Sequence, residues 1–107
     1  MSITEAKKVK QFLTHKIRLA WRFYSEKRRI CLRSRRCRIC EQGGRIFADH
    51  IHPVVDVKKG FVDWNTYIKR MFEGDLQPLC AICHKLKSKK EGEARRKYKW
   101  DKKLKGP

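Results

Sequence analysis

Cys37-Arg-Ile-Cys40 and Cys80-Ala-Ile-Cys83-His84 are the two stretches of this sequence that decide its fold. Each holds two cysteines separated by two residues, a spacing that places both thiols at the tip of a tight knuckle. Two such pairs can complete a tetrahedron of sulfur around one zinc ion. We therefore expect the four cysteines to form a structural zinc site that joins a loop near residue 40 to a helix near residue 80.

A second group of metal-binding side chains lies between the two cysteine pairs, in Asp49-His50-Ile-His52. An acid beside a histidine offers hard or borderline ligands that suit a catalytic divalent ion. The alternative is a purely structural role, in which the acid belongs to a turn and the neighbouring histidine is hydrogen-bonded. His52 could be a spare ligand or a supporting group. His84 could substitute for a zinc ligand, although four cysteines leave it no vacancy.

The composition indicates one small domain with a limited core, because 107 residues are the size of one domain and 40% are hydrophobic against 37% charged. Metal binding is expected to supply part of the folding free energy. No apolar run approaches the ~18 residues of a membrane span, and no signal peptide is recognisable. We expect a cytoplasmic protein away from membranes, where thiols stay reduced. The fifth cysteine, Cys31, is expected to be a small buried hydrophobic residue.

The net charge of +18 is concentrated at the two ends of the chain. Residues 1–36 hold 12 Lys/Arg against 2 acids, residues 37–84 hold 6 against 6, and residues 85–107 hold 11 against 3. Basic arms around a neutral centre suit a nucleic acid gripped at both flanks, although charge runs can also be solvated faces. Within one structural domain we distinguish a basic helical region 1–36, a zinc-clamped core 37–91 and a basic tail 92–107.

Helical periodicity dominates the first region. Ser2 and Glu5 match a capping box, and apolar residues follow at spacings of three and four. They predict a long helix, broken near Ser25 and resumed through Ile30. Its apolar stripe is expected to pack in the core: Val9, Phe12, Leu13, Ile17, Ala20, Trp21 and Tyr24. Its opposite face is expected to meet phosphates: Lys7, Lys8, Lys16, Arg18 and Arg22.

The core region predicts two strands followed by a helix. Residues 45–50 and 51–57 read as two short β runs joined around His50, so we expect Asp49 and His50 at the bend of an antiparallel pair. An extended segment, residues 75–79, then leads into a helix that begins at the second cysteine pair.

A short helix is inserted between these parts. Asp63 can cap it and Gly74 can end it. Its apolar face is expected to comprise Trp64, Ile68, Met71 and Phe72. The tail after residue 91 is either a frayed helix or a disordered arm.

Taken in this order, the motifs resemble those of the HNH endonucleases, in particular the small phage-type group with two zinc knuckles. The resemblance covers roughly residues 12–91. Its specific signals are Cys37/Cys40, Asp49-His50-Ile-x-Pro53 and Leu76-Gln-x-Leu-Cys80-x-x-Cys83-His84-x-x-Lys87. It implies a small α+β fold in which a ββα-metal motif, clamped by the four-cysteine zinc site, follows a long N-terminal helix. It also implies the cytoplasm of a bacterium or of a phage-infected host.

By the same resemblance, Asp49 and His84 would hold one magnesium, manganese or nickel ion, and His50 would be the general base. The substrate would be DNA, most readily double-stranded. A histidine of ordinary pKa near 6.5 can take a proton from water, and a divalent ion can stabilise the charge on the phosphate and on the departing oxygen. Three basic side chains would contact flanking phosphates or remain solvated: Arg45, Lys85 and Lys87.

One position departs from the family pattern. Where the family has an asparagine before Leu-Gln, this chain has Asp75. In the family this asparagine holds the loop that carries the general base, through both its carbonyl acceptor and its amide donor. An aspartate keeps the hydrogen-bond acceptor and loses the donor. The added charge could tighten cation binding or raise the pKa of His50. Two interpretations follow. One is a metal-dependent endonuclease or nickase with Asp75 in its catalytic set; the other is a non-catalytic zinc module that binds nucleic acid on the same scaffold.

Overall fold

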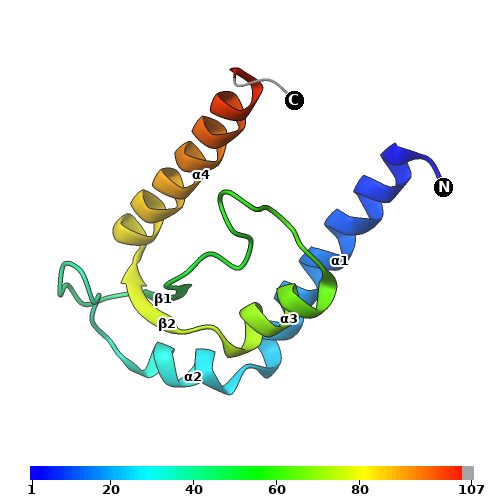
Figure 1. Cartoon of the computed structure of the whole chain (residues 1–107). Helices are drawn as coiled ribbons and strands as arrows, with labels where there is room; N and C mark the ends of the chain where they lie inside the picture. The colour runs from blue at the N-terminus through cyan, green and yellow to red at the C-terminus, as the bar shows by residue number, and fades with distance from the viewer. Residues whose placement is uncertain (105–107) are drawn as a thin grey trace.

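The structure, a computed structural model, describes residues 1–104. Its elements in chain order are α1 (Ile3–Tyr24), α2 (Glu26–Arg33), β1 (Ile46–His50), α3 (Trp64–Glu73), β2 (Leu76–Cys80) and α4 (Ala81–Leu104). In Figure 1 the sheet and α2 lie at the base, and the long helices α1 and α4 both extend upwards from it. The described chain is α+β, with four helices and one two-stranded sheet. None of these helices combines the length and the hydropathy that a membrane crossing requires.

One serine ends α1 and begins α2. The Ser25 N–H donates to the Trp21 carbonyl at 3.0 Å, and the Ser25 hydroxyl accepts from the Arg28 N–H at 3.2 Å. At the other end of α1, the Ser2 hydroxyl accepts from the Glu5 N–H at 3.1 Å. These side chains satisfy N–H groups that a helix start leaves without partners. The cap at Ser2 and the break at Ser25 are therefore confirmed.

The sheet pairs β1 with β2, and this corrects the predicted pairing around His50. The strands are antiparallel, with Asp49 opposite Gln77 and His50 opposite Leu76. Residues 51–57 form no strand with β1. Pro53 cannot donate to a strand ladder, and the Ile51 N–H instead donates to the Asp75 carbonyl at 2.9 Å. Asp49 and His50 thus lie at the end of a strand and not at the bend of a hairpin. The second strand is Leu76–Cys80, in the segment that was predicted only to be extended.

The core lies between α1 and α3. Asp63 caps α3 by accepting from the Thr66 N–H at 2.6 Å, and Gly74 ends it, as predicted. The buried cluster comprises Trp21, Tyr67 and Met71. Ile68 is 42% exposed and does not join this face. Tyr67, four residues before Met71, takes the core position because the face of α3 that meets α1 is rotated by about one residue from the predicted face.

The apolar stripe of α1 packs in the core only around Ile17 and Trp21, and both ends of the stripe are exposed. Trp21 is 7% exposed, whereas Val9, Phe12 and Tyr24 are 44%, 59% and 78% exposed. The predicted core packing of the whole stripe is therefore wrong among the described residues. The reason is geometric, since α3 covers only the part of α1 that lies next to the sheet, and the first turns of α1 project beyond it (Figure 1).

Helix α4 begins directly after Cys80 and continues to Leu104. Of the two alternatives for the tail, the helical one describes residues 92–104; residues 105–107 lie outside the described residues. Cys80 is the last residue of β2, and the first turn of α4 carries Cys83 and His84, so the junction of the two elements places the second cysteine pair and a histidine at the edge of the sheet.

Candidate functional site

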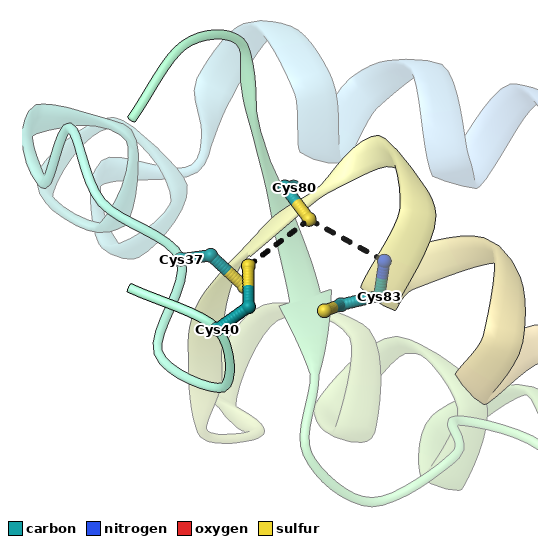
Figure 2. A group of neighbouring side chains, drawn as sticks. All are labelled: Cys37, Cys40, Cys80 and Cys83. Atoms are coloured by element: carbon teal, nitrogen blue, oxygen red, sulfur yellow. Dashed lines mark hydrogen bonds between the residues drawn. The ribbon is translucent and has the colours of Figure 1, made fainter. Parts of the chain in front are cut away.

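The four cysteines of the two knuckles come together at one end of the sheet (Figure 2). One ligand atom from each lies within 4.8 Å of all the others: Cys37, Cys40, Cys80 and Cys83. The expected gathering of these cysteines is confirmed. Backbone hydrogen bonds fix the first knuckle, since the Cys37 N–H donates to the Gln42 carbonyl and the Arg38 N–H to the Pro78 carbonyl of β2, both at 2.9 Å.

The spacing of the sulfurs and the lowered pKa of Cys37 suit a metal ion. The Cys40 and Cys80 sulfurs are 3.7 Å apart, and the edge of a tetrahedron with zinc–sulfur bonds of 2.3 Å is about 3.8 Å. Backbone N–H groups, above all that of Cys40, lower the pKa of the Cys37 thiol to about 6. The hydrogen bond between the Cys83 thiol and the Cys80 sulfur raises the pKa of Cys83 to about 12. Cys37 therefore favours the thiolate, the form that binds metal. The spacing of the four sulfurs is consistent with structural zinc.

Cys31 and His84 stand outside this cluster. Cys31 is half-buried on α2, and its burial raises the pKa of its thiol. His84 stacks on Phe47, with ring centroids 5.5 Å apart, and its Nε2 is 3.7 Å from Oδ1 of Asp49. The histidine that follows the second knuckle thus faces the strand carrying Asp49, and the sulfur cluster is complete without it.

Asp49 is buried and meets three side chains. Gln77 Nε2 donates to its Oδ2 at 3.0 Å, Lys87 Nζ is 3.2 Å from the same oxygen, and His84 faces the other oxygen. Gln77 is itself buried and lies directly opposite Asp49 in the sheet. The strand register therefore fixes the orientation of the carboxylate.

Lys87 has a structural role at this site, because its ammonium group contacts both Asp49 and the backbone of His50. Its ammonium also donates to the His50 carbonyl at 2.9 Å and pairs with Glu91 one turn further along α4. Burial alone would lower the pKa of Lys87, but the hydrogen bonds to Glu91 and Asp49 outweigh it and raise that pKa. Lys87 thus stays protonated and ties α4 to the end of β1.

The ring of His50 is held in one tautomer. Its Nε2 lies 2.8 Å from the Met71 carbonyl, and because a carbonyl can only accept, Nε2 carries the proton. This leaves Nδ1 as a lone-pair acceptor. The Trp21 ring packs against the imidazole, with centroids 4.7 Å apart. Burial lowers the pKa of His50 below its ordinary value, so the imidazole is neutral at neutral pH.

The other sequence-predicted residues are less central. The Asp75 side chain is 80% exposed and lies 3.9 Å from Lys27; only its backbone carbonyl, through Ile51, holds the segment after His50. His52 is exposed and belongs to no strand, so the predicted alternation with His50 does not apply. Lys85 is exposed, whereas Arg45 lies over the Phe47 ring at 5.0 Å.

A cavity of about 610 Å³ opens beside Asp49, His50 and His84, with walls from α1, α2, β1 and α4. Sequence reasoning did not assign Gln77, Trp21 or Glu91 to this site. Gln77 could have been assigned to the site from its position opposite Asp49, but that position is known only when the register of the two strands is known. No family model, curated protein or solved structure matches this chain. The fold and the site define a small α+β protein with two features. One is a cluster of four cysteines that could bind a metal ion, and the other is a cavity lined by several arginines.

Proposed function

We propose that this protein is a metal-dependent endonuclease of the HNH type that hydrolyses phosphodiester bonds of DNA. The observation that carries the proposal is the juxtaposition of Asp49, His84 and the free Nδ1 of His50 at one cavity. The succession of β1, β2 and α4 supports a ββα-metal motif, and the four cysteines support a structural zinc clamp beside it. The zinc would contribute folding free energy rather than chemistry.

The Asp49–His84 pair fits a hard divalent ion. Ligands about 2.1 Å from an octahedral centre lie about 3.0 Å apart when adjacent and about 4.2 Å apart when opposite. The 3.7 Å between Asp49 Oδ1 and His84 Nε2 lies between these two spacings, so a side-chain movement of less than about 1 Å would bring the two atoms to the adjacent spacing. A carboxylate and an imidazole suit magnesium, manganese or nickel. When bound, such an ion would stabilise negative charge on the phosphate and on the departing oxygen.

The remaining steps belong to the side chains. His50 Nδ1 takes a proton from the attacking water, because the Met71 carbonyl already engages the proton on Nε2. The lowered pKa of His50 keeps the imidazole unprotonated at neutral pH. Gln77 of β2 orients the Asp49 carboxylate, and Lys87 of α4 holds the carbonyl of His50. The general base and the metal ligand are thus held by β2 and α4. Arginines in the cavity wall neutralise the incoming phosphates.

The test is nicking of supercoiled plasmid by purified zinc-loaded protein with added magnesium, manganese or nickel. We expect wild type to nick the plasmid and His50→Ala to lose the activity while retaining zinc content, circular dichroism and DNA affinity. His52→Ala is the matched control, because His52 lies two residues away and is exposed. Equal nicking by the two variants would contradict the role of His50.

A second candidate is a non-catalytic zinc module that binds nucleic acid. The observation that favours it is Lys87, whose ammonium lies 3.2 Å from the carboxylate that would bind the ion. The Asp75 carboxylate also lies near Lys27. It therefore does not supply the segment after His50 with the side-chain hydrogen-bond donor that the resemblance leads us to expect in an active nuclease. DNA binding without nicking under any of the three metals would favour this candidate.

A further inference from the structure

The cavity beside His50 has an excess of positive charge. Six cationic and two acidic side chains line it: Arg18, Arg22, Arg28, Arg45, Lys87, Arg95, Asp49 and Glu91. Both acids already pair with Lys87. The five arginines therefore face the cavity without a carboxylate of their own among residues 1–104, and an anion entering the cavity would relieve their mutual repulsion.

The five arginines differ in how far their guanidinium groups are engaged. Arg28 donates to the Arg22 carbonyl at 3.0 Å, Arg95 donates to the Val55 carbonyl at 2.8 Å, and Arg45 lies over an aromatic ring. Within the part of the chain that the structure describes, the guanidinium groups of Arg18 and Arg22 have neither a hydrogen bond nor an ion pair. These two side chains remain available for a ligand.

The placement of Arg18 and Arg22 follows from Trp21. Because Trp21 is buried and packs against the His50 ring, the rotation of α1 about its axis is fixed. Arg18 and Arg22 are one helical turn apart, so their Cβ atoms are about 5–6 Å apart on the cavity side of α1. Two guanidinium groups at that spacing can converge on one tetrahedral anion.

We propose that Arg18 and Arg22 bind one backbone phosphate of a nucleic acid, next to the phosphate that faces His50 and Asp49. The ligand class rests on the proposed function, while the anion site rests on the cavity and on the two unengaged guanidinium groups. A planar guanidinium matches phosphate geometry with two parallel hydrogen bonds, which a lysine cannot provide. In this arrangement α1 positions the nucleic-acid strand relative to the general base, His50.

The experiment uses the zinc-loaded full chain without added divalent ions, so that binding is separated from cleavage. The probes are the thymidine dinucleotide TpT, which carries one phosphodiester, and inorganic phosphate; binding is followed through the side-chain N–H resonances of the arginines by NMR. The variant is Arg18→Gln/Arg22→Gln. The control is Lys58→Gln/Lys59→Gln, which removes the same charge from an exposed loop that does not line the cavity.

We expect TpT to shift the Arg18 and Arg22 resonances saturably. We also expect its dissociation constant to rise roughly tenfold or more in the arginine variant and to stay unchanged in the lysine control. Equal weakening in both variants would overturn the site, and so would inorganic phosphate binding as tightly as TpT. If wild type fails to nick plasmid although TpT binding depends on the arginines, the proposed nuclease function fails and this inference stands. If wild type nicks while the arginine variant binds TpT normally, the inference alone fails.

Discussion

Gln77→Leu is the substitution that most directly probes how the fold holds its buried carboxylate. Gln77 and Asp49 are 9% and 8% exposed, and they share one hydrogen bond of 3.0 Å. A hydrogen bond to a charged group contributes about 1.5–3 kcal/mol, and its loss leaves the carboxylate partly unsatisfied. Because Lys87 still faces the same oxygen at 3.2 Å, we expect a cost near the lower limit, about 1.5 kcal/mol. Leucine is of similar size, so the cavity left behind is small.

The measurement is urea unfolding of zinc-loaded protein followed by circular dichroism, with an unchanged slope and a lower midpoint for Gln77→Leu. Gln11→Leu is the control, since Gln11 is exposed on α1 and should change stability by less than about 0.5 kcal/mol. A double-mutant cycle with Asp49→Ala should give a coupling free energy of about 1 kcal/mol or more. A stability equal to that of wild type, or a coupling free energy near zero, would refute the reasoning.

Three further predictions concern the core, the exposed acid and the basic end of α4. Leu79→Ala should lower the unfolding free energy by about 2–5 kcal/mol in the same urea assay, because Leu79 is 0% exposed; a smaller decrease would mean that the site collapses around the smaller residue. Asp75→Asn should leave the unfolding midpoint and plasmid nicking near wild type, since that side chain is 80% exposed, and a large gain in nicking would show that an asparagine reaches the loop of the base after all. Removing residues 97–107, which keeps Arg95, should weaken DNA binding across all sequences and lower the salt slope by about 0.9 for each phosphate that these residues neutralise; an unchanged slope in a fluorescence anisotropy titration would assign the segment to solubility alone.

The features that sequence could predict are local ones. Caps at Ser2 and Asp63, the break at Ser25 and the two cysteine knuckles each depend on residues within a few positions of one another. The two Cys-x-x-Cys spacings also carried a long-range prediction, because only one tetrahedron uses all four thiols.

The features that sequence could not predict depend on partners that are distant along the chain. The pairing of β1 with β2 across α3 was missed because residues 51–57 look like a neighbouring strand, and only Pro53 argued against it. The hydrogen bond of Gln77 to Asp49 and the orientation of Asp75 both follow from that register. The exposed positions of the α1 stripe could not be predicted either, since the pattern of apolar residues does not reveal which part of α1 is covered by α3.

The central claim is that the chain separates a four-cysteine metal site from an Asp49–His84 site. It is tested most directly by the zinc content per chain, measured by mass spectrometry of the intact protein after extensive dialysis. We predict roughly one zinc in wild type, the same in His84→Ala, and none in Cys80→Ser, whose far-ultraviolet circular dichroism should fall with the zinc. Retention of zinc by a folded Cys80→Ser protein, or loss of zinc from His84→Ala, would contradict the separation of the two sites.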